Sequence, residues 1–418
     1  MTSAFSYHNG VLCAEQVSLK RITAEVGTPF YCYSTAQLQE NYHAYADALK
    51  GLKAKIFYAI KANANTAVMR TLAAMGAGAD ITSAGEMERA LHAGVKPAMI
   101  AYSGVGKRRD EIAAALQQGV YQLNVESIPE LHLIEEVAAE LNRKATITLR
   151  VNPDVAARTY KKTSTGELGT KFGIDLRQLD EAMALIKTLP HIDFTGFQVH
   201  IGSHVYDYEP FREAFLKLAE LVRFWRGKGF TIDRLDLGGG VGIPYDGQTL
   251  APFSDYAAIV RSTVGDLDCE LGFEPGRRIV GDAALLVSRV IYDKQGFNRR
   301  FLILDAGMND LIRPAMYEAR HSIQPVREPV AGAKDALADV VGPVCETSDL
   351  FGVDYRLPGV GQGDLVAILQ AGAYGAAMSS NYNGRPLIPE VLVSGDKFTV
   401  IRRRVSVQEQ IGWESAAG

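Results

Sequence analysis

Short apolar runs alternate with longer helical patterns between residues 55 and 276. The apolar runs are residues 56–63, 78–83, 98–103, 121–126, 146–152, 194–201, 234–238 and 269–274. The segments between them place apolar residues three and four positions apart, as in 84–93, 128–141 and 208–225. Eight strand–helix units are what a closed (β/α)8 barrel needs, whereas an open doubly wound sheet usually has fewer strands and one glycine-rich dinucleotide turn. The alternation therefore predicts a (β/α)8 barrel.

The pattern changes after about residue 277, where helical spacing nearly disappears. Runs rich in Val, Ile and Leu with Gly and Pro turns predict strands at 284–293, 299–305, 338–343, 364–370 and 397–408. Residues 1–29 also have the pattern of short strands and turns, and a helix-like segment follows at 35–50. We expect an α/β chain with a barrel over 30–277 and a mainly antiparallel β domain built from 1–29 and 278–418.

The composition gives no reason to expect a nucleic acid or a membrane as partner. The chain has 418 residues, 22% of them charged, and a net charge of −4. No apolar run reaches the length of a membrane span, and no signal-peptide pattern is visible at the N-terminus. The cysteines lack zinc-site spacing: Cys13, Cys32, Cys269 and Cys345. We expect reduced thiols, at least three of them in the core, in a cytoplasmic protein without a metal site.

Chemically active residue types gather at the predicted carboxyl ends of the barrel strands, where this architecture builds its active site. These residues are Lys61, Asp80, Arg150, His200, Ser203, the run Gly238–Gly242, Glu274, Gly276 and Arg277. A lysine, a histidine, two arginines, carboxylates and a glycine-rich turn at one rim predict a single active site.

Two of these features point to pyridoxal 5′-phosphate (PLP). Lys61 ends an apolar strand, where a cation is costly to bury, and a neutral amine there would form a Schiff base with an aldehyde. The glycine run leaves backbone N–H groups open to a phosphate, with Ser203 and Arg277 as further donors. Glu274 is the candidate carboxylate for the pyridine nitrogen. Taken singly, each feature also fits an ordinary structure: an ion-paired lysine, a tight turn, or a glutamate paired with Arg277.

The surrounding motifs resemble those of the alanine-racemase-like (fold type III) PLP decarboxylases. In the barrel the matching stretches are Tyr58–Asn63, His200–Ser203, Gly238–Gly242 and Glu274–Arg277. In the C-terminal half, the stretches that resemble the diaminopimelate decarboxylase branch of this family are Asn309–Tyr317, Gly342–Asp349 and Ala371–Gly375. The similarity runs in matching order from about residue 25 to 411, so it covers nearly the whole chain.

The resemblance implies roles for the matching residues that contact the cofactor. Lys61 would carry PLP, Asp80 and Arg150 would hold the surroundings of Lys61 and Glu274, and His200 would stack on the ring. The residues that would bind the phosphate or lie beside it are Ser203, Gly239, Gly240, Gly276, Arg277 and Tyr374.

It also implies a substrate site. Arg277, Arg313 and Tyr317, with Tyr374 nearby, would bind the carboxylate at the non-reacting end of the substrate. Glu346 would bind the amine of that end, and Cys345 would act as proton donor. Because the neighbouring subunit offers this cysteine in the family, the resemblance implies a homodimer with shared active sites.

The activity implied is decarboxylation of meso-2,6-diaminopimelate to L-lysine and CO2, the last step of lysine biosynthesis. The first alternative is a decarboxylase of the same fold acting on ornithine, arginine or a carboxy-polyamine, which would have little use for Arg313 with Tyr317 and Glu346. A PLP-binding protein without catalysis would need only the barrel. A racemase would call for a tyrosine base rather than the Cys345–Glu346 pair.

Two positions depart from the family pattern. Tyr160 stands where many relatives have His, within the polar stretch 154–170 that we expect to be a mobile loop over the active site. His204 follows Ser203 where Gln is common. These departures bear on loop closure and fine specificity, and they leave the cofactor assignment unchanged.

Overall fold

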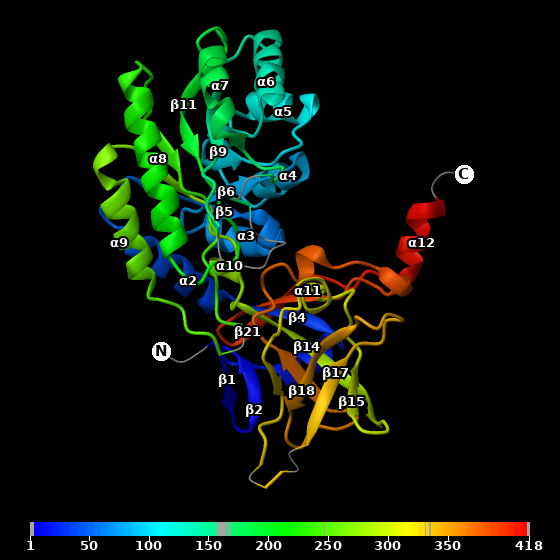
Figure 1. Cartoon of the computed structure of the whole chain (residues 1–418). Coiled ribbons are helices and arrows are strands. Elements are labelled where there is room, and N and C mark those ends of the chain that lie inside the picture. Colours follow the sequence, from blue (N-terminus) through cyan, green and yellow to red (C-terminus); the bar gives the residue numbers. More distant parts are fainter. Residues whose placement is uncertain are drawn as a thin grey trace. The chain divides into compact units, whose positions relative to one another are not determined.

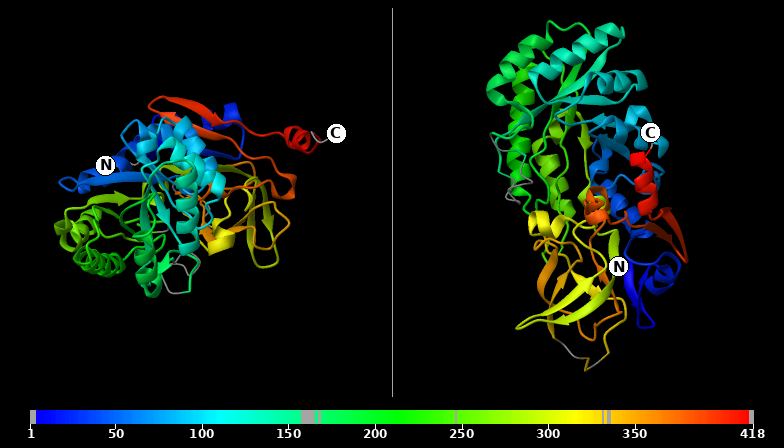
Figure 2. Two further views of the ribbon diagram at one scale, coloured as in Figure 1. Left: turned by 90° about the horizontal axis from the view of Figure 1, so that it is seen from above. Right: turned by 90° about the vertical axis from the view of Figure 1, so that its right-hand side faces the viewer.

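The computed structural model describes residues 4–156, 165–166, 169–245, 247–330, 332–333 and 336–415. The chain divides into two compact units (Figures 1 and 2). One unit, which we call the barrel unit, comprises Tyr42–Ile243 and Thr249–Arg278. The other, the β unit, comprises Met1–Asn41, Pro244–Gln248 and Ile279–Gly418.

Eight parallel strands form the barrel unit. They are β5 (Ala54–Ala59), β6 (Gly78–Ile81), β7 (Ile100–Tyr102), β8 (Gln122–Val125), β9 (Ala145–Asn152), β11 (Ile192–Gln198), β12 (Arg234–Asp236) and β13 (Glu270–Phe273). Their order is β9-β11-β12-β13-β5-β6-β7-β8, and β8 pairs back to β9 to close the barrel. The short β10 (Ile174–Asp175) adds to β9. The predicted (β/α)8 barrel is confirmed.

Helices follow the strands where the apolar spacing predicted them (Figure 1). They are α3 (Thr66–Ala73), α4 (Ala84–His92), α5 (Arg109–Gln118), α6 (Ile128–Glu140), α7 (Leu179–Ile186), α8 (Glu209–Gly227) and α9 (Phe253–Thr263). Ser83 and Ser127 cap α4 and α6 by accepting from the backbone N–H groups of Glu86 and Glu130. α8 buries its apolar side, on which Phe211 meets Tyr256 of α9 edge to face with centroids 5.1 Å apart.

The first barrel strand is shorter than predicted, which changes the setting of Lys61. The run 56–63 was expected to be extended, but β5 ends at Ala59 and Lys61 lies in the 3-10 turn η1 (Ile60–Ala62). The Tyr58 hydroxyl donates to the Asn63 carbonyl at 3.0 Å and closes this turn. The apolar run continues past the strand because Ile60 and Ala62 are buried inside the turn.

The β unit contains a nine-stranded sheet and a small three-stranded sheet. The strands of the large sheet are β4 (Phe30–Ser34), β14 (Ala284–Gln295), β15 (Arg300–Leu304), β16 (Ile323–Pro325), β17 (Leu337–Val341), β18 (Leu350–Arg356), β19 (Leu365–Ile368), β20 (Glu390–Ser394) and β21 (Lys397–Arg402). The small sheet holds β1 (Phe5–His8), β2 (Val11–Ala14) and β3 (Val17–Ser18). Most pairings are antiparallel, whereas β15–β17 and β4–β20 are parallel.

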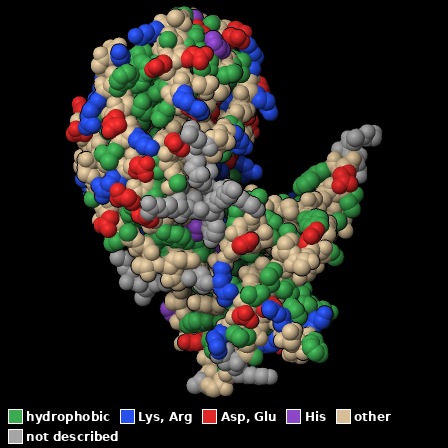
Figure 3. All heavy atoms as spheres, in the orientation of Figure 1, with side chains coloured by type: hydrophobic (Ala, Val, Ile, Leu, Met, Phe, Trp, Pro, Cys, Tyr) green, Lys and Arg blue, Asp and Glu red, His purple; other side chains and the backbone are tan. Residues whose placement is uncertain are grey.

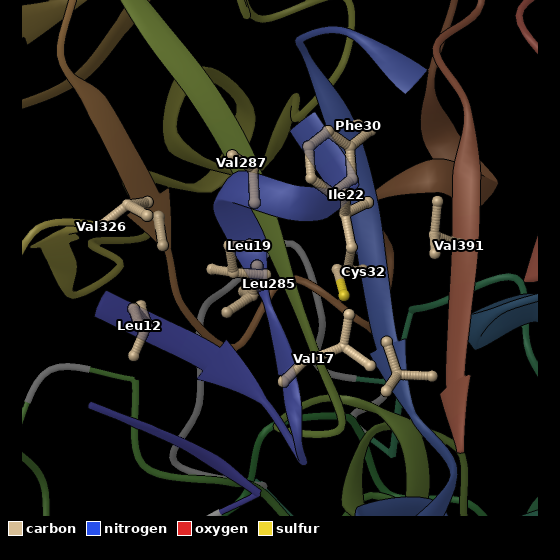
Figure 4. Packing of buried hydrophobic residues seen from close by; sticks show 13 residues of the cluster. Leu12, Val17, Leu19, Ile22, Phe30, Cys32, Leu285, Val287, Val326 and Val391 are labelled. Atoms are coloured by element: carbon tan, nitrogen blue, oxygen red, sulfur yellow. The ribbon is translucent and has the colours of Figure 1, made fainter. Parts of the chain in front are cut away.

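The core of the β unit joins the two ends of the chain (Figure 4). Leu12, Val17 and Ile22 pack with Leu285 and Val391 in one buried cluster. The sequence analysis placed residues from 30 onward in the barrel, and this boundary is wrong. β4 pairs antiparallel with β14 and parallel with β20, so an all-buried apolar strand serves the β sheet instead.

Two further expectations for the β unit need correction. The run 397–408 was predicted as one strand, but β21 ends at Arg402 and a helix, α12 (Val407–Ser415), follows. Ser406 starts this helix because its hydroxyl accepts from Glu409 N at 3.2 Å while the Glu409 carboxylate accepts from Ser406 N. A helix α1 (Leu19–Val26) also interrupts the N-terminal strands, capped by Ser18.

Charged side chains of both signs are interspersed on the face shown in Figure 3. Within the described part of the chain, we find no helix with the length and apolar character that crossing a membrane requires. Cys13, Cys32 and Cys269 are buried, as expected for core residues, whereas Cys345 is exposed.

Candidate active site

Lys61 presents its amine beside a buried carboxylate. β5 and β6 pair up to Ala59 and Asp80, and Lys61 lies in the turn just beyond. Lys61 Nζ lies 2.8 Å from Asp80 Oδ2, where the Asp80 side chain is fully buried and that of Lys61 is 35% exposed. The amine is therefore held in one place and can still be reached by an aldehyde.

Glu274, just past β13, is held by donors that lie in or just past three other strands of the barrel. Its Oε1 accepts from Ser103 Oγ at 3.2 Å and from Asn124 Nδ2 at 3.1 Å. Its Oε2 accepts from Gln198 Nε2 at 3.2 Å. Ser103 follows β7, Asn124 lies in β8 and Gln198 ends β11. The carboxylate is thus fixed in orientation by neutral groups.

The electrostatics around Glu274 favour the arrival of a cation. Burial, followed by the negative charges of Asp236 and Asp80, raises the pKa of Glu274 well above its usual value. The cations Lys61 and Arg150 oppose this shift in pKa only in part. A protonated pyridine nitrogen beside Glu274 would supply the missing positive charge.

Asp236, at the end of β12, is a second buried acid in the barrel. Its Oδ1 accepts from Gly238 N at 3.0 Å and its Oδ2 from Gln122 Nε2 at 3.2 Å. Burial, more than the charge of Asp80, raises the pKa of Asp236 to about 6. Asp236 therefore fixes the start of the glycine run through its hydrogen bond with Gly238.

His200, just past β11, is a neutral ring. Burial, followed by the charges of Arg150 and Lys61, lowers the pKa of His200 well below its usual value. Its Nδ1 accepts from Gly239 N at 3.2 Å, so the remaining ring proton sits on Nε2. A neutral, oriented ring next to the glycine run suits stacking on a flat ligand.

The glycine run is packed so closely that a side chain would not fit. A Cβ on Gly239 would lie 2.1 Å from the Glu274 carbonyl oxygen. A Cβ on Gly240, which has a φ of +111°, would lie 2.3 Å from the Gly202 carbonyl oxygen. Gly276 is similarly close to the turn of Lys61, with its Cβ position 2.9 Å from Ala62 Cβ. Only glycine therefore allows the backbone to take this close packing at these positions.

Two arginines complete the rim. Arg277, at the start of α10 (Arg277–Val280), donates from Nη2 to Ser203 Oγ at 3.1 Å. Arg150 donates from Nη1 to Glu126 Oε1 at 2.7 Å, and both side chains of this pair are buried. The direct partner of Arg150 is thus Glu126, while its charge also acts on Glu274 and His200.

These residues fit PLP. The buried Asp80 Oδ1 has no hydrogen-bond partner among the described residues, so the pocket still holds an unused acceptor next to Lys61. Lys61 suits the aldehyde, Glu274 the pyridine nitrogen, and the glycines with Ser203 and Arg277 the phosphate. The barrel unit therefore brings together all the sequence-predicted cofactor residues except Tyr374, which belongs to the β unit.

In the β unit, Arg313 and Tyr317 lie at the two ends of the short helix α11 (Arg313–Tyr317). Arg313 is 2% exposed, and its guanidinium carbon lies 4.0 Å from the centre of the Tyr245 ring. Tyr317 is only partly buried. One turn of helix thus carries both predicted carboxylate-binding residues.

Cys345 and Glu346 lie together in an exposed turn of the same unit. Cys345 N donates to Asn383 Oδ1 at 3.0 Å, and the thiol-bearing residue is exposed. Glu346 Oε1 accepts from the Tyr382 hydroxyl at 2.7 Å. The loop that contains Asn383 and Tyr382 therefore orients both predicted functional residues.

Tyr374 has a backbone φ of +56°, in the left-handed region that bulky residues rarely adopt. The next residue, Gly375, is confined because a Cβ there would lie 2.5 Å from the Ala371 carbonyl oxygen. A strained tyrosine held by such packing is a mark of a functional position.

Sequence reasoning missed the groups that orient the predicted residues. Asn124, Gln198 and Glu126 hold Glu274 and Arg150, and their signal was a polar residue inside or just past an otherwise apolar strand. Tyr160 and most of the predicted loop 154–170 lie outside the described residues. His204 is buried, and its Nε2 lies 2.6 Å from the Tyr206 hydroxyl.

Comparison with known proteins agrees with this geometry. Residues 35–281 match the family model "Pyridoxal-dependent decarboxylase, pyridoxal binding domain". The diaminopimelate decarboxylase of Pseudomonas aeruginosa is 46% identical over 411 residues, which cover 98% of each chain.

Solved structures agree as well. The diaminopimelate decarboxylase of Helicobacter pylori, complexed with L-lysine, superposes with a TM-score of 0.91 at 39% identity and covers 94% of this chain and 98% of its own. The M. jannaschii enzyme, also in complex with L-lysine, gives a TM-score of 0.93 at 34% identity over 98% of this chain and 97% of its own. With a lysine, a glutamate and a glycine cradle arranged for PLP, and with such similarity over nearly its full length, the chain belongs to the diaminopimelate decarboxylase family of PLP-dependent enzymes.

Proposed function

We infer that this protein is a carboxy-lyase that converts meso-2,6-diaminopimelate to L-lysine and CO2, the last step of lysine biosynthesis. The observation that carries this inference is the pairing of Lys61 with Asp80 at the same barrel rim as Glu274 and the glycine run. Membership of the diaminopimelate decarboxylase family supports the substrate, as do the L-lysine complexes of two relatives.

The cofactor, when bound through its aldehyde to Lys61, supplies a ring that accepts the electrons left by the departing carboxylate. The chain's own residues would keep that ring in place and charged. Glu274, a buried carboxyl group, would hold the proton on the pyridine nitrogen, and the neutral imidazole of His200 would stack on the ring. Gly239 and Gly240, with the paired Ser203 and Arg277, would hold the phosphate.

We propose that the residues of the β unit bind the non-reacting end of the substrate. Arg313 and Tyr317, together with Arg277 and Tyr374, take its carboxylate, and Glu346 takes its amine. A buried guanidinium and a positioned carboxylate suit a zwitterionic amino-acid end. Ornithine and arginine offer no second α-carboxylate to Arg313, so they cannot make the interaction that the diaminopimelate carboxylate would make there.

Cys345 is proposed as the proton donor. Its Sγ would transfer a proton to the carbon that lost CO2, and the exposure of this residue fits a group that meets substrate. We further propose a homodimer in which Cys345 serves the partner's site. A cytoplasmic location belongs to the same proposal, supported by four free thiols.

A carbon dioxide release assay tests the function. Purified protein is incubated with meso-diaminopimelate, ornithine or arginine, each with and without added PLP. We expect that, of the three substrates, only meso-diaminopimelate releases CO2. Adding PLP to protein stripped of cofactor should increase this release. Faster release from ornithine or arginine would reject the assigned substrate, and equal release without any cofactor would reject the PLP assignment.

A further inference from the structure

The guanidinium of Arg313 is held by a histidine eight positions further along the chain. Arg313 Nη1 lies 2.7 Å from His321 Nε2, and both residues are almost fully buried. The guanidinium carbon lies 4.0 Å from the centre of the Tyr245 ring, and His321 meets the same ring edge-on with centroids 5.0 Å apart. His321 and Tyr245 thus both contact the guanidinium of Arg313.

The partners of His321 determine its protonation state. Its Nδ1 lies 2.8 Å from the Leu369 carbonyl oxygen, which can only accept a hydrogen bond, so Nδ1 carries a proton. Its Nε2 faces Arg313, which can only donate, so Nε2 carries a lone pair. The ring is therefore neutral, with its single proton on Nδ1.

Several hydrogen bonds hold the backbone around His321. The Tyr355 hydroxyl of β18 donates to the His321 carbonyl at 2.5 Å. The adjacent Ser322 donates from both N and Oγ to the Tyr245 carbonyl, and the Leu369 N–H bonds to the Ser322 carbonyl. The imidazole therefore links the end of β19 to α11 in a fixed geometry.

A neutral acceptor has an effect on the arginine that a carboxylate would not have. A carboxylate would orient Arg313 but would also neutralise its charge and compete with an incoming anion. The lone pair of His321 orients one N–H group of the guanidinium without adding a negative charge beside it. A guanidinium held in one orientation presents a planar set of donors that matches a planar carboxylate.

We propose that His321 is a positioning residue that, as the Nδ1–H tautomer anchored on Leu369, orients Arg313 for the carboxylate at the non-reacting end of the substrate. This inference rests on the proposed function, in which Arg313 binds that carboxylate.

Two variants test separately the hydrogen bonds that the two ring nitrogens of His321 make. In His321→Gln the side-chain oxygen reaches the position of Nε2 and keeps an acceptor for Arg313. In His321→Asn the amide reaches only the position of Nδ1, so it keeps the donor to Leu369 and loses the acceptor. Calorimetry on the holoenzymes measures binding of L-lysine, which keeps the carboxylate, and of 1,5-diaminopentane, which lacks it. Thermal melting and the visible absorbance of bound PLP verify that each variant is folded and loaded.

We expect His321→Asn to weaken L-lysine binding about tenfold or more, as loss of a hydrogen bond to a charged group does, with 1,5-diaminopentane unaffected. His321→Gln should stay within about threefold of the unmodified protein for both ligands. If His321→Asn does not fold, His321→Phe, which keeps a ring without an acceptor, replaces it in the comparison.

The outcomes distinguish the two levels of inference. Equal affinity of the unmodified holoenzyme for L-lysine and 1,5-diaminopentane would show that no residue reads the carboxylate, and the proposed role of Arg313 would be wrong. A clear preference for L-lysine that survives in His321→Asn would overturn the positioning role alone. Equal losses in both variants, or equal losses for both ligands, would likewise assign His321 a purely structural role.

Discussion

At the scale of single residues, Lys61 is the side chain on which the proposed chemistry depends. The chain offers a matched control in Lys55, which lies in β5, the strand that leads into the turn of Lys61, and pairs with Glu270 at 2.8 Å. Lys61→Ala removes the amine that anchors the cofactor, so the visible absorbance of protein-bound PLP and the release of CO2 should both fall to background. Lys55→Ala should retain both. A normal absorbance spectrum in Lys61→Ala would contradict the assignment.

Cys345 allows a second test at this scale. Cys345→Ala removes the proposed proton donor while its backbone contact with Asn383 remains possible. Loss of a general acid lowers rates by about 10²–10⁴-fold, so kcat should fall within that range while L-lysine binding stays unchanged. Cys345→Ser, which keeps an O–H at the same place, should lose less activity. Stopped-flow kinetics with an unchanged rate in Cys345→Ala would remove the residue from the mechanism.

Asp310 provides a pH-dependent effect on stability. It accepts from Gly307 N at 3.0 Å, and burial raises its pKa to about 6. Because the folded pKa lies above the unfolded one, this group stabilises the fold below about pH 4, and that contribution is lost as the pH rises through about 6. Asp310→Asn keeps an acceptor oxygen and has no charge. Between those pH values the free energy of unfolding of the unmodified protein should therefore fall by up to about 3 kcal/mol. Asp310→Asn should not show this decrease.

Thermal melting of the two proteins at about pH 4 and about pH 7 checks this expectation. The decrease in melting temperature with rising pH should be smaller for Asp310→Asn. Identical decreases would mean that Asp310 does not titrate in this range.

At the scale of elements, the periodicity of apolar residues predicted the repeated strands and helices, but it missed local features that depend on individual contacts. The eight barrel strands and the helices α4, α6 and α8 followed from spacing because each buries a whole face. The turn of Lys61, by contrast, depends on individual contacts such as the hydrogen bond from Tyr58 and the close packing around Gly276. The link from His321 to Arg313 depends on tertiary packing, which no local pattern encodes.

The glycine turn after β12 can be tested as an element. In Gly239→Ala the new Cβ would lie 2.1 Å from a backbone carbonyl oxygen, so the turn has to move. Such overpacking costs about 1–3 kcal/mol, and the affinity for PLP should fall by about tenfold or more. Gly227→Ala at the end of α8 is the matched control, because nothing lies within 4 Å of the added carbon. Fluorescence titration of the cofactor-free proteins with PLP measures the affinity of each variant. Equal affinities of Gly239→Ala and Gly227→Ala would contradict a role of the glycine turn in binding PLP.

At the scale of the whole molecule, the sequence predicted two kinds of unit but misplaced one strand between them. β4 carries five buried residues and is followed closely by α2 (Thr35–Ala48), so its pattern resembles a barrel strand. Only its pairing with β14 and β20 assigns it to the β unit. The assignment of an apolar strand to one of two sheets depends on contacts more than 200 residues away in sequence, since β14 begins at Ala284.

The proposed homodimer with shared sites leads to a prediction at the scale of the whole molecule. If Cys345 of one subunit serves the Lys61 of the other, then Lys61→Ala and Cys345→Ala damage different halves of each site. In a mixed dimer one site receives both altered residues, while the other receives an intact Lys61 and an intact Cys345. Random exchange between equal amounts of the two inactive variants gives half mixed dimers with one good site each, so activity should recover to about a quarter of normal. Activity is followed as CO2 release after mild dissociation and reassociation, with each variant treated alone as control. If both residues of a site come from one chain, mixing restores nothing, and the shared-site arrangement is wrong.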